Sequence, residues 1–342
     1  MTRDTVCDVT LPFRVLYLAI TSFKRPAAAE DYMDSPTPKT YDVVGLGVST
    51  LDLLMVVDEL PGSELVQRAH DSLLQGGGPI ATALVALSRL GCSTAMIDKL
   101  GDDWRGKLIR EEFERERVAT DYLILAAGQT TSIASVLVRK LDGARTIIYA
   151  PGDAGEVVPS DIAEDLISSA KILHLNGRHP DACLSSARIA KKHGVLVSFD
   201  GGAHRFTDQL RPLIGLTDLC IVARQFAFAF SGSADIQTSA AKLLQSGPSI
   251  VVITAGTEGS WIFDQGGDCF HQPAYQLSES VDTTGAGDAY HGAFLYGLIQ
   301  DYSLRKCGQF ASAVASLNTR KLGGRTGLPS LEEAMKFLNE DR

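Results

Sequence analysis

Short apolar segments alternate with longer segments of helical periodicity along most of this chain. In its C-terminal half, strands are predicted at 172–175, 195–199, 219–222 and 250–254, and helices at 160–170, 180–193 and 235–246. A strand that is apolar along its whole length is buried on both faces, which is typical of parallel sheets. Because parallel strands need crossover connections, this alternation predicts an α/β fold, a doubly wound parallel sheet with helices on both faces.

The same alternation begins near the N-terminus. Residues 41–47 form a short apolar segment that runs into glycines, as expected for the first strand of a buried sheet. A flexible loop at Gly76–Gly78 leads into a helix rich in alanine and leucine that ends at Gly91. A strand at 93–97 and a charged helix over 104–116 follow.

Two β-rich segments, 131–138 and 146–149, interrupt the alternation. The dipeptide Asp142-Gly143 lies between them and is a strong signal for a hairpin turn. An antiparallel pair inside a parallel pattern indicates a small sheet that projects from the main domain. We therefore predict a β-sheet lid built from about 53–75 and 128–150.

Composition excludes several classes of protein. The chain has 342 residues and a formal net charge of −9. An acidic balance argues against nonspecific binding to nucleic acid or anionic membranes, and no apolar run reaches membrane-spanning length. The six cysteines lack the spacing of zinc sites and give no support for a disulfide framework. We expect a cytoplasmic protein in which residues 41–342 form one domain with its lid and residues 1–40 form a poorly ordered extension.

The stretch from Asp282 to Gly292 carries the strongest chemical signal. Gly285-Ala286-Gly287 is a turn of small residues before an apolar helix over 289–299. Backbone N–H groups at a helix start lack internal partners and attract an anion. Asp288 follows at once, and an anion site beside a carboxylate suits transfer of a phosphoryl group to a hydroxyl. The alternative is an ordinary tight turn followed by a helix-terminal charge.

The string Asp282-Thr283-Thr284-Gly285-Ala286-Gly287-Asp288 resembles the C-terminal signature of the ribokinase-like, or PfkB, family of carbohydrate kinases. The resemblance extends over about residues 41–340, with the further motifs in the family's order. These motifs are Gly47…Asp52, Gly77-Gly78…Gly91, Gly101–Gly106, Pro151–Ala154, Thr254–Gly259, Ala311…Asn318, Gly323-Gly324 and Leu328–Ser330.

The resemblance implies ATP-dependent phosphorylation of a sugar hydroxyl, with Mg²⁺ offsetting phosphate charge. Asp288 would be the general base, and the N–H groups of Gly285, Ala286 and Gly287 would hold the transferred group. The implied substrate-binding residues are Asp52, Gly77, Gly78 and Thr82, and the implied nucleotide-binding residues are Thr254, Gly256, Gly259 and Asn318. Asp282 and Thr284 match positions that help to hold a monovalent cation, K⁺, in some relatives.

Four positions depart from the family pattern. Thr82 stands where many sugar-kinase relatives have Asn, so a different sugar contact is expected. The Asn-x-x-Glu stretch that organises Mg²⁺ in the family would fall near Ala223 and Phe226, where both polar residues are missing. The common Asp-Pro-Asn-x-Arg stretch begins here with Asp200 and loses its Asn. Tyr290 replaces the usual phenylalanine.

The identity of the substrate has fewer signals. The run of three glycines and a proline at 76–79 resembles the sulfofructose-kinase-like branch of the family. Arg139, in the predicted lid, could meet an anionic sugar group, although a solvated basic strand end is the favoured interpretation. Asn176 ends a strand on the expected substrate side and is a further substrate candidate.

Three functions are consistent with these features. They are a sugar kinase, which we favour, a nucleoside kinase of the same family, and a sugar- or nucleotide-binding protein that has lost catalysis. The exposed edge of the lid sheet also predicts a homodimer formed through the lid. The remaining predicted partners are small molecules, a sugar and ATP, with no nucleic acid and no membrane.

Overall fold

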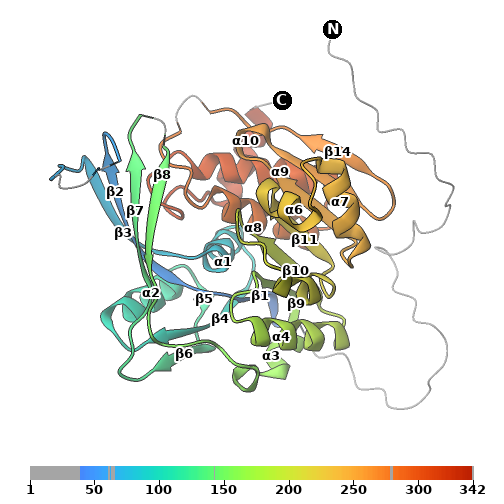
Figure 1. Ribbon diagram of the computed structural model, residues 1–342, viewed down its shortest axis with the longest axis horizontal. Helices are drawn as coiled ribbons and strands as arrows, with labels where there is room; N and C mark the ends of the chain where they lie inside the picture. Colours follow the sequence, from blue (N-terminus) through green and yellow to red (C-terminus); the bar gives the residue numbers. More distant parts are fainter. Residues whose placement is uncertain (1–38, 61, 63–65, 142, 278–279, 341–342) are drawn as a thin grey trace, which may run out of the picture.

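The structure, a computed structural model, describes residues 39–60, 62, 66–141, 143–277 and 280–340. The predicted extension therefore lies outside the described residues except for Lys39 and Thr40, and so does Asp142 of the predicted turn. Within the described part, the chain forms a large sheet with helices on both faces and a smaller sheet at one side (Figure 1).

The large sheet has ten strands among the described residues, in the order β14-β13-β12-β11-β10-β9-β1-β4-β5, with β6 beside β4. Neighbouring strands are parallel from β4 to β12, whereas β13 and β14 are antiparallel additions. The predicted doubly wound α/β fold is confirmed. The bounds are β1 Tyr41–Leu46, β4 Thr94–Gly101, β5 Val118–Ala119, β6 Leu123–Ala126, β9 Ala170–Leu175, β10 Leu196–Gly201, β11 Leu219–Ala223, β12 Ile250–Thr254, β13 Ser260–Asp264 and β14 Cys269–Gln272.

Helices cover the two faces of this sheet with separate apolar cores. Successive strand residues point to opposite faces, so Val43 and Val44 of β1 belong to different cores. The first core receives α1 Pro79–Arg89, α2 Trp104–Arg115, α8 Ala286–Ile299, α9 Leu304–Asn318 and α10 Leu331–Glu340. The second receives α3 Glu164–Ser168, α4 Pro180–Lys192, α5 Arg211–Ile214, α6 Arg224–Ser231 and α7 Ile236–Gln245.

Two helices of the second core differ from the sequence-based prediction. The helix expected over 160–170 is a 3₁₀ turn at Pro159–Asp161 followed by α3, because Ile162 and Ala163 have extended backbone angles. Helix α6 was not predicted, and its first residue follows β11 directly.

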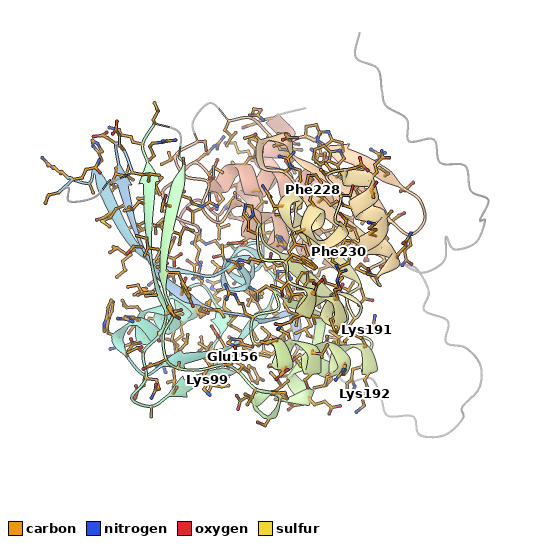
Figure 2. The ribbon with its side chains drawn as sticks, viewed as in Figure 1. Lys99, Glu156, Lys191, Lys192, Phe228 and Phe230 are labelled. Carbon is orange, nitrogen blue, oxygen red and sulfur yellow. The ribbon has the colours of Figure 1, made fainter. Side chains whose placement is uncertain are left out.

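At the C-terminal end of α4, Lys191 and Lys192 point outward on the side away from the small sheet (Figure 2), where they pair with Asp218 and Glu164.

The small sheet has the order β3-β2-β7-β8 and is built from β3 Asp71–Gly77, β2 Thr50–Val57, β7 Ile133–Arg139 and β8 Arg145–Ala150. Strands β7 and β8 form the antiparallel pair expected from the two β-rich segments. Gly143 lies in the turn between them with a φ of 67°, which suits glycine. These strands overlap the predicted lid ranges, and we refer to them as the lid sheet.

Close packing of α1 against α8 positions the two loops that begin these helices. A Cβ atom on Gly292 of α8 would lie 2.6 Å from the carbonyl oxygen of Ala83 in α1. Helix α1 starts after Gly78, where the chain leaves strand β3 of the lid sheet. Helix α8 starts after Gly285, at the end of the loop that precedes it. Helix α1 and helix α8 therefore bring a glycine loop each to one region beside the carboxyl ends of the parallel strands, where ligands bind in such folds.

We predict that Gly292→Ala destabilises the protein by about 1–3 kcal/mol, because backbone at Ala83 cannot yield to the new methyl group cheaply. The matched control is Gly308→Ala in α9. There the nearest atom is the flexible Ile262 Cδ1 at 3.0 Å, so improved helix propensity leaves stability equal or higher by about 1 kcal/mol. Urea unfolding of both variants measures this, and equal stabilities would contradict the packing described.

Candidate active site

The loop before α8 forms the centre of the candidate site. Gly285 is the N-terminal cap of α8 with a φ of 72°, and a Cβ there would lie 2.5 Å from the carbonyl oxygen of Gly324. The helix begins at Ala286, three residues earlier than the apolar pattern predicts, so Gly287 and Asp288 lie in its first turn. The Ala286 N–H donates to Thr283 O at 3.3 Å, whereas a Cβ on Gly287 would meet nothing within 4 Å. Space is therefore open beside the helix N-terminus.

Buried side chains hold this loop in place. Asp282 is fully buried, and its Oδ1 accepts from the N–H and hydroxyl of Thr284 at 2.8 and 2.7 Å. Its Oδ2 accepts from Gly323 N–H at 2.9 Å. The Asn318 side-chain amide donates to Thr284 O at 3.3 Å and to Gly324 O at 3.0 Å. The loop before α8 and the loop after α9 are thus one hydrogen-bonded unit.

Asp288 lies beside a second carboxylate, Asp200, at the end of β10. Burial raises the pKa of Asp288, and the negative charge of Asp200 raises it further. Burial also raises the pKa of Asp200. The His291 Nε2 atom is 3.7 Å from Asp200 Oδ1, but burial lowers the pKa of His291 to about 3, so the ring is neutral. Three arginines, Arg205, Arg145 and Arg325, oppose the rise in the pKa of Asp288.

Asp52 of β2 faces the same space from the lid side. Its Oδ1 accepts from the Thr50 hydroxyl at 2.5 Å. Burial raises the pKa of Asp52, and the charge of Asp288 contributes to this shift. Asp52 lies in the lid sheet next to the loop that starts α1, and Asp288 lies in the first turn of α8. The charge of Asp288 acts on Asp52, so the two carboxylates lie in one region of the site.

Each glycine from 76 to 78 is required for a different reason. A Cβ on Gly77 would lie 1.9 Å from Asp52 Oδ2, so only glycine lets the carboxylate occupy its place. Gly78 caps α1 with a φ of 98°, a conformation that other residues rarely adopt. A Cβ on Gly76 would lie 2.5 Å from a nitrogen of Arg325. The loop is shaped by close contact with charged side chains rather than by flexibility alone.

Comparison with known proteins decides the family. The model of pfkB family carbohydrate kinases matches residues 41–331. The chain belongs to this family. It is a carbohydrate kinase, a phosphotransferase with an alcohol group as acceptor, as the resemblance of its motifs predicts.

Individual relatives agree with the family assignment. An uncharacterized sugar kinase of Archaeoglobus fulgidus is 33% identical over 254 residues, which cover 72% of this chain and 98% of the relative. A nucleoside kinase of Methanothermobacter thermautotrophicus is 30% identical over 308 residues, covering 86% and 94%. The structure of Arabidopsis thaliana ribokinase complexed with ribose and ATP is similar with a TM-score of 0.77 and 26% identity, covering 87% of this chain and 98% of that one.

Two other predicted substrate residues of this kinase have distinct surroundings. Thr82 is 2% exposed, and its hydroxyl accepts from Arg325 Nε at 3.2 Å. Asn176 is 7% exposed, and its Oδ1 accepts from Arg178 N–H at 3.1 Å. Its Nδ2 has no hydrogen-bond partner among the described residues. A buried amide donor without a partner is costly, so Asn176 is suited to bind a ligand oxygen.

The structure does not bring Arg139 next to Asp52. In the lid sheet Asp52 pairs in register with Ala134, and Arg139 lies five residues further along β7. At the rise of a β-strand that separation is about 16 Å. A contact between Arg139 and the sugar stays a prediction. Arg145 of β8, which was not predicted, reaches the site instead and donates to the Thr283 hydroxyl at 2.7 Å.

The predicted nucleotide loop follows β12 at the carboxyl edge of the sheet. Gly256 and Gly259 have φ values of 59° and 92°, and a Cβ on Gly259 would lie 2.1 Å from Gln272 O. The hydroxyl of Thr254 donates to Val222 O at 3.5 Å. Arg224, which begins α6 where the family has its Asn-x-x-Glu stretch, pairs with both oxygens of Glu258 at 2.8 and 2.9 Å.

Among the described residues, no group of three or more His, Cys, Asp and Glu side chains is arranged to hold a metal ion. None of the helices in this part of the chain combines the length and apolar character needed to cross a bilayer.

A cavity of about 430 Å³ lies outside the predicted site and is lined by Arg224, Phe228, Ala234, Asp235, Ile236, Gln237 and Trp261.

Sequence reasoning missed the charged residues that surround the predicted ones. Glu112 lies in α2, Arg205 in the loop after β10, and Arg325 in the loop after α9. In the sequence, Glu112 is one of several charges on a charged helix, and Arg325 is a single arginine among glycines. Their importance depends on contacts between distant segments, which no local pattern contains.

We predict that Gly77→Ala raises the KM for the sugar tenfold or more, because the new Cβ displaces the Asp52 carboxylate, which we expect to bind the sugar hydroxyls. The KM for ATP should change little. Gly215→Ala is the control, since its Cβ would find backbone atoms at an ordinary 3.4–3.6 Å. Steady-state kinetics measures both variants, and an unchanged sugar KM in Gly77→Ala would show that Asp52 is not held as described.

Proposed function

We propose that this kinase transfers the γ-phosphoryl group of ATP to a sugar hydroxyl, with Asp288 as general base. The observation that carries this proposal is the placement of Asp288 in the first turn of α8, where its charge also acts on Asp52. A carboxylate at that position can accept the hydroxyl proton while N–H groups at the helix start hold the anionic group. The raised pKa of Asp288 makes it a stronger base than an ordinary aspartate.

The sugar side of the site is formed by donors and acceptors from both sheets. Asp52 would accept two hydrogen bonds from neighbouring hydroxyls, and the backbone of Gly77 and Gly78 lets the sugar approach closely. The unpartnered Nδ2 of Asn176 would donate to a further oxygen. Thr82 would contribute its hydroxyl while it accepts from Arg325.

The nucleotide side would use Thr254, Gly256 and Gly259. The N–H groups of Gly285, Ala286 and Gly287 would surround the transferred group, with open space beside Gly287. Mg²⁺ carried by the phosphates would offset their charge, since Ala223 and Phe226 offer no ligand. The charges of Arg205 and Arg145, which oppose the rise in the pKa of Asp288, would add positive charge on this side of the site.

Two of the predicted ligand roles have less support. Asn318 is fully buried and bound to Thr284 O and Gly324 O, so it would border the adenine only through the loop it supports. The oxygens of Asp282 and Thr284 already accept or share internal hydrogen bonds, so K⁺ would have to share them. The proposed mechanism therefore assigns no step to K⁺, and its effect is tested by including K⁺ in the assay.

Lid closure would protect the reaction from water. Arg145 connects the lid strand β8 to the loop before α8, so the lid already reaches the phosphate side.

Strand β8 is an edge strand whose Ile147 and Ile148 are 53% and 63% exposed. Such an edge favours pairing with a second copy of the chain, so we include a homodimer through the lid, to be checked by sedimentation. A cytoplasmic location stays a prediction.

The experiment that tests the function is a coupled ADP-release assay over a panel of substrates. The panel holds ribose, fructose, fructose phosphates, sulfofructose, ketodeoxy acids and nucleosides, each with Mg²⁺ and with either K⁺ or Na⁺. Turnover of a sugar supports the proposal. Turnover of nucleosides alone supports the second candidate, which the nucleoside kinase relative favours. Ligand-induced thermal shifts without any turnover would support a non-catalytic binding protein, as the losses at Ala223 and Phe226 suggest.

We predict that Asp288→Asn lowers kcat by about 100- to 10,000-fold while sugar binding, followed by thermal shift, is retained. In the wild type, activity requires ionised Asp288 and is lost as pH falls through its raised pKa. The acid limb of kcat/KM should therefore lie above the ordinary aspartate range. This limb should be absent from the residual activity of the variant. Near wild-type turnover in Asp288→Asn would refute the assignment of the base.

A further inference from the structure

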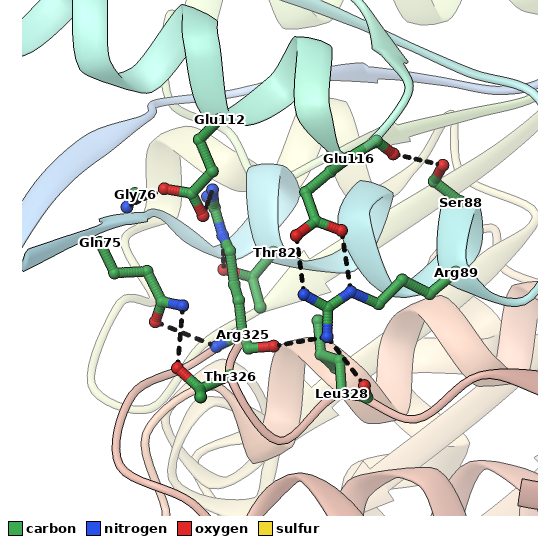
Figure 3. Close-up of polar contacts among 10 residues, drawn as sticks. All are labelled: Gln75, Gly76, Thr82, Ser88, Arg89, Glu112, Glu116, Arg325, Thr326 and Leu328. Carbon is green, nitrogen blue, oxygen red and sulfur yellow. Dashed lines mark hydrogen bonds and ion pairs between the residues drawn. The ribbon is translucent and has the colours of Figure 1, made fainter. Parts of the chain in front are cut away.

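Arg325 is the largest side chain that is fully buried among the described residues. It lies in the loop between α9 and α10, and its guanidinium group enters the space between α1, α2 and the end of β3 (Figure 3). Burial of a charge is expensive unless it is paired and hydrogen-bonded. Such a group is retained for what it holds in place, and its partners show what that is.

All three guanidinium nitrogens of Arg325 have partners. Nη1 is 3.1 Å from Glu112 Oε1, Nε donates to the Thr82 hydroxyl at 3.2 Å, and Nη2 donates to Gly77 O at 2.9 Å. The cation also lies 5.4 Å from the ring centre of Phe113. Arginine suits this place because its donors form a rigid planar fork, which lysine cannot reproduce.

The two members of the Arg325–Glu112 ion pair bind neighbouring residues of the glycine loop, Gly76 and Gly77. Glu112 Oε2 accepts from Gly76 N–H at 2.6 Å, while Arg325 holds the carbonyl of Gly77 (Figure 3). The backbone of Gly76 and Gly77 is thereby fixed against the carboxylate of Asp52. A Cβ on Gly76 would lie 2.5 Å from Arg325 Nη1 and 2.9 Å from Glu112 Oε2. Only glycine at this position therefore leaves room for both charged groups.

The adjacent residue in the same loop supports the other half of the site. Gly324 lies against Gly285, the cap of α8, and its carbonyl accepts from Asn318. Consecutive residues of one loop thus contact the start of α8 and the loop that starts α1.

We propose that Arg325 is a positioning residue that acts through Glu112 and the Gly76–Gly77 backbone to set the affinity of the site for its sugar. The inference rests on the proposed sugar kinase function and adds a determinant of substrate affinity to it. Arg325 does not touch the substrate. It holds the backbone that the substrate and Asp52 contact.

A separate arginine anchors the loop itself. Arg89 of α1 donates from Nη1 to Arg325 O at 2.9 Å and to Leu328 O at 2.8 Å, and it pairs with Glu116 at 2.7 Å (Figure 3). None of these contacts reaches the glycine loop. Arg89 and Glu116 therefore form a natural control, since their loss weakens the same C-terminal loop without releasing Gly76 or Gly77.

The test compares two charge-balanced double variants, Arg325→Met with Glu112→Gln and Arg89→Met with Glu116→Gln. Removing both charges avoids an unpaired buried charge, which by itself destabilises strongly. The sugar is the panel compound that the wild type turns over with the highest kcat/KM. In the Arg325/Glu112 variant we expect the sugar KM to rise about tenfold, because one to two hydrogen bonds at the glycine loop are lost. The kcat and the KM for ATP should stay within about threefold of wild type.

The Arg89/Glu116 variant should lower the melting temperature but keep the sugar KM of the wild type. The single variant Arg325→Lys keeps the charge, loses the fork and should give an intermediate sugar KM, which provides a second measurement if the double variant does not fold. Equal rises in sugar KM for both double variants, or no rise in the Arg325 variants, would overturn the inference alone. Absence of turnover in the wild type would overturn the proposed function and the inference with it.

Discussion

The site depends on the buried ion pair between Arg325 and Glu112 and on the glycine beside it, Gly324. Arg325 fixes the loop that starts α1, and Gly324 packs on the residue that starts α8. Helices α1 and α8 also pack closely against each other, where Gly292 approaches the backbone of Ala83. A buried pair of this kind adds little net stability, so its value lies in the geometry that it imposes.

That geometry brings together two carboxylates to which we assign different tasks, Asp52 and Asp288. Asp52 is held by Thr50 and Gly77 on the lid side, where it can bind hydroxyl groups. Asp288, the proposed base, lies in the first turn of α8, where its burial and then the charge of Asp200 raise its pKa. The charges of Arg205, Arg145 and Arg325 limit this rise. Affinity and basicity are thus set by residues that do not react.

Local patterns account for the fold because each element carries its own signal. Continuous apolar strands, helix periodicity and the Gly143 turn are contained in short windows, and the α/β sheet with its small second sheet follows from them. The apolar pattern predicts a start at Ala289 for α8, three residues too late, because Ala286–Asp288 carry no apolar periodicity. Arg325 could not be recognised, because its partner Glu112 lies 213 positions away and the reason for Gly76 is visible only when both are in contact.

The most direct test of this account is a crystal structure of the protein with ADP, Mg²⁺, aluminium fluoride and the sugar that it turns over. The account predicts the fluoride group on the N–H groups of Gly285–Gly287 and the attacking hydroxyl within about 2.6–3.2 Å of the Asp288 carboxylate. Asp52 should accept hydrogen bonds from other hydroxyls of the same sugar. A sugar bound away from Asp52, or a reacting hydroxyl out of reach of Asp288, would contradict it.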